Sequence, residues 1–159
     1  MPLYKDLSDD VAKILIWEFD KDEELNVDLL LEPENQSKIL GYHPNKIAEV
    51  LMVRKMLKTL LPNHKILYRE NGEPYLFPQD FHISISHSYP LAALAISTKK
   101  VGIDLEKRKE KIKNIRHKFV LHEDLYIDNS KEMDFLTAIW CVKEALYKIH
   151  HSKHWSLKK

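Results

Sequence analysis

The sequence predicts an α+β protein, in which antiparallel strands and helices occupy separate stretches of the chain. Two segments with a helical spacing of apolar residues, 43–62 and 131–150, flank a strand-rich middle. In that middle, three short runs of strand character are joined by connections of four and three residues, HSYP and TKK. Connections this short favour antiparallel neighbours.

Composition limits the possible classes of function. The 159 residues are 44% hydrophobic and 31% charged, which suits one domain or two small lobes with a common core. A net charge of +1 gives no overall attraction to nucleic acid. No apolar run is long enough to span a membrane, and the N-terminus lacks a secretion-signal pattern. No membrane partner is therefore expected. Because Cys141 is the single cysteine, the chain can form no internal disulfide, and it is expected to be cytoplasmic.

The first half of the chain has one strand signal and one helix signal. Residues 11–19 are rich in β-branched and aromatic side chains, which is typical of a strand. In the segment 43–62, Pro44 suits a first helical turn and Pro62 ends the helix. NGEP at 71–74 predicts a turn. The stripe expected to be buried on the helix comprises Ile47, Val50, Leu51, Leu57 and Leu61.

The second half contains the predicted three-stranded meander and the last helix. Residues 81–86 and 101–106 alternate apolar and polar side chains, whereas 91–97 is apolar nearly throughout. One or two helical segments are expected over 114–127, followed by the helix over 131–150. The apolar stripe predicted for that helix comprises Phe135, Ile139, Val142, Leu146 and Ile149.

Two carboxylates share one face of the predicted strand 101–106. Alternation places Asp104 and Glu106 on the same side as Gly102, roughly 7 Å apart along the backbone. Such a pair repels unless a cation lies between its members, and Mg²⁺ is commonly held by one or two carboxylates together with substrate phosphate. A solvated strand end preceding the charged run KRKEK is the alternative interpretation.

Two further groups of polar residues accompany these acids. Trp140, Glu144 and Lys148 share one face of the last helix, turned away from its predicted apolar stripe. Glu144 and Lys148 could form an ordinary surface pair, but exposing a tryptophan beside them is costly, so this face is expected to contact something. The run SISHS at 84–88 supplies hydroxyl and imidazole donors suited to phosphate, or alternatively to stabilising a turn.

Taken together, these stretches resemble the 4′-phosphopantetheinyl transferase superfamily. The resemblance rests on FHISISHS (81–88), VGIDLE (101–106) and WCVKEALYK (140–148), and it extends from about residue 11 to 157. RENGEPYL (69–76) is also similar to a family segment, with Glu73 where lysine is usual. The triple is specific, whereas each motif alone is not.

The resemblance implies transfer of the 4′-phosphopantetheine arm from coenzyme A to a serine of an acyl or peptidyl carrier protein, with release of 3′,5′-ADP. It implies a Mg²⁺ site, and Lys143 belongs to the motif's Lys-Glu pair. It does not indicate which pathway the carrier serves. The metal ligands would be Asp104, Glu106 and Glu144. The catalytic residues would be Glu144, Lys148 and Asp104. The coenzyme A contacts would be Ser86, His87, Lys148, Arg54 and Arg69.

The fold that the resemblance implies is the Sfp-type pseudo-dimer, in which each of two lobes packs a small antiparallel sheet against a long helix. The lobes would be residues 1–98 and 99–159, with the site in the cleft between them. The second lobe is expected to be incomplete, because family members continue through further strands after the KEALYK helix. A truncated homologue that binds coenzyme A or a carrier without turnover is therefore a second hypothesis.

Two interpretations lie outside this family. A metal-dependent phosphodiesterase could use the same acids without an acceptor protein, although the SHS run and the lysine helix would contribute little to it. The histidines near the C-terminus could also form a zinc site, since residues four apart can share a helical face. Those histidines are His150, His151 and His154.

Overall fold

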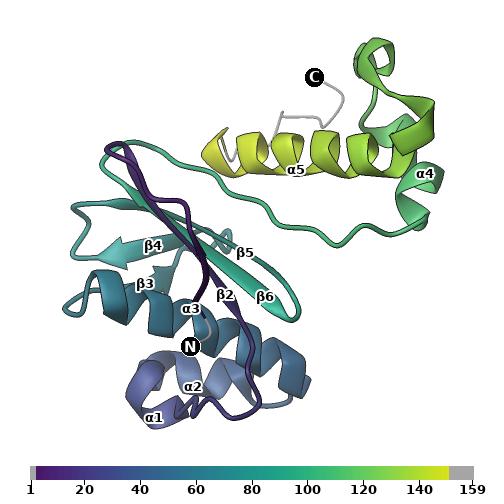
Figure 1. Ribbon diagram of the computed structural model, residues 1–159. Coiled ribbons are helices and arrows are strands. Elements are labelled where there is room, and N and C mark those ends of the chain that lie inside the picture. Colours follow the sequence, from purple (N-terminus) through teal and green to yellow (C-terminus); the bar gives the residue numbers. More distant parts are fainter. Residues whose placement is uncertain (1–2, 151–159) are drawn as a thin grey trace.

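A four-stranded antiparallel sheet with the order β1-β2-β6-β5 forms the centre of the computed structural model, which describes residues 3–150 (Figure 1). Its strands are β1 (Leu3–Asp6), β2 (Ala12–Glu18), β5 (His82–Ser88) and β6 (Leu91–Ser97). A separate hairpin is formed by β3 (Lys65–Tyr68) and β4 (Pro74–Phe77). The fold is therefore the α+β class expected, with every strand pair antiparallel.

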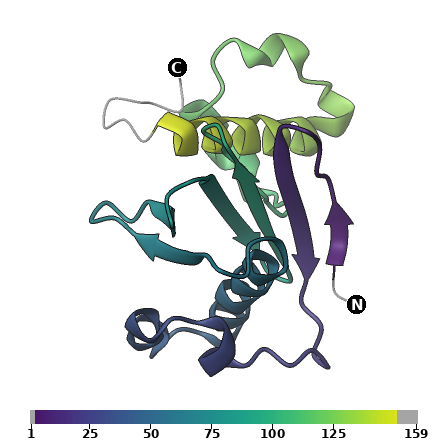
Figure 2. The ribbon, with the colours of Figure 1, turned by 90° about the vertical axis from the view of Figure 1, so that its left-hand side faces the viewer.

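The long helix α3 (Pro44–Leu60) covers one face of the sheet (Figure 2). Two shorter helices, α1 (Val27–Leu30) and α2 (Pro33–Ile39), lie beside it. Apolar side chains of α3, the sheet and the hairpin form the main core. Its buried members include Leu15, Trp17, Met52, Val53, Met56, Leu57, Ile66, Leu76, Leu94 and Ile96.

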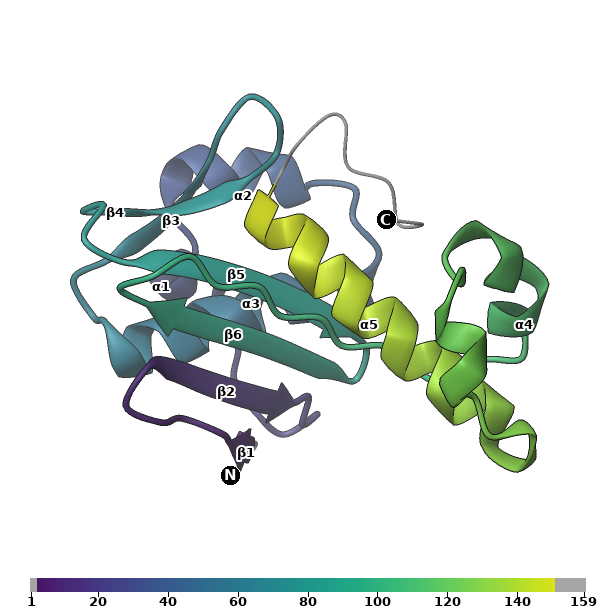
Figure 3. The same ribbon diagram turned by 90° about the horizontal axis from the view of Figure 1, so that it is seen from above.

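The chain after β6 covers the opposite face of the sheet. Residues 100–109 have no regular secondary structure and run along β5 before α4 (Lys111–Ile115) (Figure 3). Three single 3₁₀ turns then lead to α5 (Glu132–His150), which lies above the sheet (Figure 1). The turns are Arg116–Lys118, Glu123–Tyr126 and Asn129–Lys131. A small second core between α4 and α5 contains Ile112, Phe119, Val120 and Leu136.

Most of the expected elements are present. The strands predicted at 11–19, 81–86 and 91–97 are β2, β5 and β6, and the predicted helices are α3 and α5. The turn predicted at 71–74 lies in the connection 69–73 between β3 and β4, where Gly72 has a φ of +83°, and Pro74 begins β4. The expected helical segments around 114–127 are α4 and the short turns after it.

The predicted strand at 101–106 is wrong. This segment is extended, but its amide groups bond to serine hydroxyls of β5 rather than to the backbone of a neighbouring strand. The alternation that suggested a strand reflects a different environment on each side. Gly102 meets α5, while the amide of the next residue, Ile103, meets β5.

The apolar stripe predicted for α5 is wrong at two of its five positions, whereas Ile139 packs against the second core as expected. Val142 is 59% exposed and Leu146 is 40% exposed, whereas Leu136, which was not in the stripe, is fully buried. The inward face instead carries Lys148, which bonds to β5 and to the extended segment. Periodicity located the helix but not the face that packs, because the polar side chains on this helix have partners inside the protein. On α3, likewise, the periodicity missed three of the most buried side chains, Met52, Val53 and Met56.

No strand follows β6 within residues 3–150, so the two-lobed pseudo-dimer stays a proposal. Of the three histidines considered for zinc, His151 and His154 lie outside the described residues. No helix in the described part of the chain is long and apolar enough to cross a membrane.

Gly102 allows the extended segment to touch the backbone of α5. A Cβ atom at this position would lie 2.0 Å from the carbonyl oxygen of Ala145 and 2.9 Å from Cγ1 of Ile149. The Gly102→Ala variant should therefore lower the free energy of unfolding by about 2–4 kcal/mol, because neither backbone can retreat without losing other contacts. Chemical denaturation measures this loss.

Gly41→Ala is the matched control. Gly41 has a φ of +89° but open space around its Cβ position, so its substitution carries only conformational strain, about 1–2 kcal/mol. A loss for Gly102→Ala no larger than that for Gly41→Ala would show that the close contact with α5 is not a constraint.

Candidate active site

The carboxylate of Asp104 is the centre of a buried polar cluster. Its Oδ1 atom accepts a hydrogen bond from Lys148 Nζ at 2.9 Å and another from Ser86 Oγ at 3.0 Å. Lys148 Nζ also donates to the carbonyl oxygens of Ile103, at 2.8 Å, and Ile85, at 3.3 Å. The Asp104 side chain is only 7% exposed. One lysine of α5 thus binds both the extended segment and β5.

Negative charge is concentrated around this cluster. The pKa of Glu144 is raised, chiefly because the carboxyl group is partly buried and next because the charge of Asp104 is near. Glu106 adds to the shift, and the ammonium group of Lys148 opposes it. Oδ2 of Asp104 is buried and has no hydrogen-bond partner among the described residues. The three acids expected from the sequence therefore influence one another electrostatically.

These acids fit a hard cation in charge and in donor type. An unpartnered buried carboxylate oxygen and a neighbouring acid with a raised pKa are both relieved by a positive charge. Within residues 3–150, however, no group of three or more His, Cys, Asp or Glu side chains is arranged to hold a metal ion. Asp104, Glu106 and Glu144 would have to draw closer together to share one.

Cys141 is a site residue that the sequence interpretation missed. Its half-buried thiol lies on α5 near both Asp104 and Glu106, and these carboxylates, after burial itself, raise its pKa to about 12. The thiol is therefore protonated at neutral pH and is a poor nucleophile. Its position one turn before Glu144 was the one available signal, and a lone cysteine in a helix carries little information.

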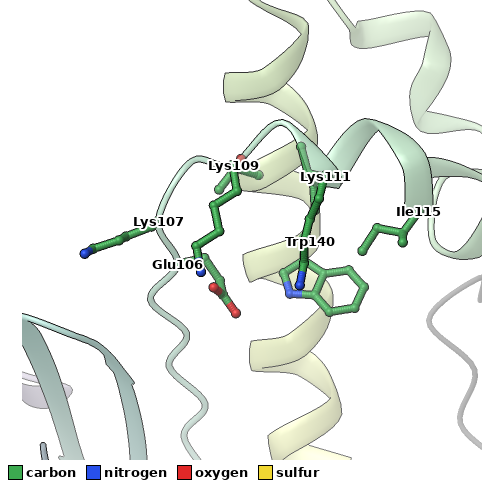
Figure 4. A pocket seen from close by; sticks show the side chains of 8 residues that line it. Glu106, Lys107, Lys109, Lys111, Ile115 and Trp140 are labelled. Carbon is green, nitrogen blue, oxygen red and sulfur yellow. The ribbon is translucent and has the colours of Figure 1, made fainter. Parts of the chain in front are cut away.

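A hollow of about 390 Å³ opens beside the acids, between the extended segment, α4 and α5 (Figure 4). Trp140 forms part of its wall, and its ring packs against Phe119 in a T-shaped arrangement with 5.2 Å between centroids. The expectation that Trp140 contacts something is confirmed. The remaining lining residues are Glu106, Lys107, Lys109, Lys111, Ile112, Ile115 and Thr137.

Lys143, the motif neighbour of Glu144, has a structural environment. Its Nζ donates to the carbonyl oxygen of Phe119 at 2.6 Å and pairs with Glu123 at 2.6 Å. Hydrogen bonding to this ammonium group lowers the pKa of Glu123 to about 2. Lys143 therefore ties the turns before α5 to that helix.

A second cavity, of about 460 Å³, gathers three of the expected coenzyme A contacts. Arg54, Arg69 and His87 come from α3, the β3–β4 turn and β5, and all three line this cavity. Arg54 is almost fully buried: its Nε lies 3.5 Å from Glu32 and its terminal nitrogens donate to the hydroxyl of Tyr68. Other polar lining residues are Asn35, Lys38, Tyr42, Lys46 and Glu70.

Lys46 is a further basic residue that the motifs did not reveal. Its Nζ lies 2.7 Å from His87 Nε2, and Nδ1 of the same ring lies 3.2 Å from Glu49. Burial, and then the charge of Lys46, lower the pKa of His87, while Glu49 partly opposes the shift. The imidazole is thus neutral at pH 7 and accepts a hydrogen bond from Lys46, which supplies the positive charge at this end of the cavity.

A smaller hollow of about 280 Å³ lies beside β5 and α5. Its lining includes Lys148 and Ser84, and it shares Gly72 with the basic cavity. Ser86, the remaining predicted contact, uses its hydroxyl within the protein: it donates to Asp104 and accepts from the amide of Leu105 at 3.0 Å. The expected residues therefore form a basic region, around His87, and an acidic region, around Asp104.

Comparison with known proteins agrees with the resemblance found in the motifs. Residues 100–157 match the family model of the 4′-phosphopantetheinyl transferase superfamily. A 4′-phosphopantetheinyl transferase of Aneurinibacillus migulanus is 38% identical over 108 residues, which are 62% of this chain and 44% of that protein. One of Bacillus subtilis is 33% identical over 86 residues, 50% of this chain and 38% of that protein. The chain thus spans less than half the length of the curated relatives it matches.

The Asp104–Lys148 pair should contribute to stability far more than a surface ion pair. Asp104→Asn and Lys148→Met should each lower the free energy of unfolding by about 2–4 kcal/mol, because each leaves a buried partner without its counter-charge. The double variant should lose about 1–2 kcal/mol less than the sum. Chemical denaturation of the four proteins gives this coupling energy.

Arg108 and Asp134 form the comparison pair. They lie 2.9 Å apart, but their side chains are 64% and 46% exposed, so solvent screens their interaction. Their double-variant cycle should give a much smaller coupling. Equal coupling in the two pairs would contradict a special role for the buried one.

Proposed function

We infer, from the similarity of residues 100–157 to the 4′-phosphopantetheinyl transferase superfamily, that the chain moves the 4′-phosphopantetheine arm of coenzyme A to a serine of an acyl or peptidyl carrier protein. The second product would be 3′,5′-ADP. The single observation that carries this proposal is the cluster in which Ser86, Asp104 and Lys148 meet. These residues come from three motifs that are far apart in the sequence.

The basic cavity would hold the nucleotide end of coenzyme A. Phosphate groups bind where several cationic donors converge, and Lys46, Arg69 and Lys38 line one hollow together with the imidazole of His87. The buried guanidinium group of Arg54 adds positive charge to this cavity, and the carboxylate of Glu32 balances part of that charge. The aromatic ring of Tyr68 is also part of the lining, and Lys38 Nζ lies 5.5 Å from its centroid.

The acidic cluster would face the pyrophosphate group. Asp104, Glu106 and Glu144 are the residues that would hold Mg²⁺, which supplies positive charge to phosphate oxygens when bound. Lys148 already satisfies all three of its N–H donors, on Asp104 and two carbonyl oxygens. In this arrangement Lys148 holds Asp104 in place. To contact a phosphate group, its ammonium group would have to give up one of its two hydrogen bonds to carbonyl oxygens.

Glu144 is suited to take the proton from the acceptor serine. A serine hydroxyl is a weak nucleophile that needs a base close by. The raised pKa of Glu144 brings this carboxylate nearer to the operating pH, where a general base is more effective. The serine oxygen would then attack the β-phosphorus of coenzyme A, and the bond from that phosphorus to the bridging oxygen would break as 3′,5′-ADP leaves.

The two-lobed arrangement is part of the same proposal. The contacts at the centre of the site cross the expected boundary near residue 98, since Ser86 and Ile85 meet Asp104 and Lys148. A site in a cleft between residues 1–98 and 99–159 accounts for this crossing. In this view the main sheet with α3 forms the first lobe, and α5 belongs to the second.

Arm transfer to an apo carrier protein tests the activity. With coenzyme A and Mg²⁺, mass spectrometry should detect the mass of the arm on the carrier, and chelation of the metal should abolish it. Asp104→Asn keeps the shape of the side chain but removes the charge, and should lower the rate by about a hundredfold or more. Asp134→Asn removes the charge of an exposed carboxylate on α5, and this variant should transfer the arm at the normal rate.

Three other results would point elsewhere. Absence of a mass shift across several carriers, with folded protein and metal present, would exclude the proposed transfer. Binding of coenzyme A without any product would then support the non-catalytic homologue. Hydrolysis of a phosphodiester without an acceptor would support the phosphodiesterase interpretation.

The basic cavity is tested by calorimetry with 3′,5′-ADP. Lys46→Ala and Arg69→Ala should each weaken binding by about tenfold, because each removes one charged donor from the phosphate groups. Lys13→Ala, which removes an equal charge from an exposed position of β2, should leave the affinity unchanged. Equal effects from all three variants would mean that overall charge, and not this cavity, attracts the nucleotide.

A further inference from the structure

Three serines of β5 form a ladder of hydrogen bonds with the extended segment. The Oγ atoms of Ser84, Ser86 and Ser88 accept the amide hydrogens of Ile103, Leu105 and Lys107, at 3.0, 3.0 and 3.2 Å. Each pair is separated by 19 residues, so the segment runs in the same direction as β5 and advances two residues with every rung. Side-chain hydroxyls thus take the place of the carbonyl oxygens of a neighbouring strand.

The ladder requires alternate residues of β5 to face the segment. Successive side chains of a strand point to opposite faces, and Ile83 and Ile85 pack against the main core on the other face. Ser84 and Ser86 are 3% and 6% exposed, so their hydroxyls are shielded from water. A buried amide without a partner is costly, and the segment is therefore confined to the register that the hydroxyls set.

Ser84 acts on the residue next to Asp104. Its hydroxyl binds the amide hydrogen of Ile103, and the carbonyl oxygen of Ile103 accepts from Lys148 at 2.8 Å. Both polar groups of residue 103 are held, one from the sheet and one from α5. Among the described residues, this amide is the one hydrogen-bond partner recorded for the Ser84 hydroxyl, which makes no bond to the carboxylates themselves.

We propose that Ser84 is a positioning residue of the site, and that its hydroxyl anchors the backbone beside Asp104 so that the carboxylate stays where the reaction requires it. This inference rests on the proposed transfer function. Without the hydroxyl, the buried amide of Ile103 has no hydrogen-bond acceptor. A shift of the segment that brings this amide to another acceptor then lowers the free energy. Such a shift moves Asp104 relative to Lys148, Ser86 and the neighbouring acids, whereas the basic cavity stays as it is.

Ser84→Ala tests the proposal through arm transfer and through amide hydrogen exchange. The turnover number should fall by about tenfold while the KM for coenzyme A changes by less than about twofold, since positioning and not binding is lost. Exchange of the Ile103 amide, followed by NMR, should accelerate by about tenfold, because its acceptor is gone. Ser84→Thr keeps the hydroxyl and should restore both values.

Ser97→Ala is the matched control. Ser97 lies on β6 and is 5% exposed, and its hydroxyl also bonds to the backbone. It donates to the carbonyl oxygen of Val11 at 2.7 Å and accepts from the amide of Lys99 at 3.1 Å. The Ser97→Ala variant should leave the turnover number unchanged. An equal fall for Ser84→Ala and Ser97→Ala, an unchanged Ile103 amide, or a loss confined to KM would each overturn the proposal.

The two levels of inference fail in different ways. If the unaltered protein transfers no arm, the proposed function fails, while Ile103 exchange in Ser84→Ala still decides whether the hydroxyl anchors the segment. If Ser84→Ala does not fold, Ser88→Ala removes the exposed last rung. Exchange of the Lys107 amide should then accelerate, with a fall in turnover of about twofold to threefold. An unchanged Lys107 amide would overturn the ladder.

Discussion

The buried carboxylate of Asp104 is the constraint on which the arrangement of the second half of the chain depends. A carboxyl group that is only 7% exposed needs hydrogen-bond partners inside the protein, and here a lysine of α5 and a serine of β5 supply them. Because Lys148 also bonds two carbonyl oxygens, the helix cannot rotate or slide without breaking several bonds at once. Gly102 lets the segment approach α5 closely enough for these bonds to form.

This constraint determines which face of α5 turns inward. A helix that packed on its most apolar stripe would bury Val142 and Leu146, which are instead exposed. The inward face carries Trp140, Glu144 and Lys148. Lys148 is stabilised there by three hydrogen bonds, and Trp140 by packing against Phe119. The result is a site with a basic region around His87 and an acidic region around Asp104.

Local signals in the sequence predicted most of the elements, because each is a property of a short window. Alternation identified β5, apolar continuity identified β6, and periodicity with Pro44 and Pro62 identified α3. The prediction of a strand at 101–106 was wrong because the partners of this segment lie outside the short stretch of sequence on which the prediction was based. Its amides bond to hydroxyls 19 residues earlier in the chain. An extended backbone was predictable, whereas its bonding partner was not.

The sequence by itself determined the types of residue in the candidate site and their membership in three motifs. Acids, a lysine and serines at those spacings indicate a particular chemistry without knowledge of the fold. Only the tertiary structure decided how they meet. It placed Lys148 on Asp104, brought Lys46 against His87, and set the Cys141 thiol among the acids. These pairings depend on how α3 and α5 lie against opposite faces of one sheet, and burial then selects which charges must be paired.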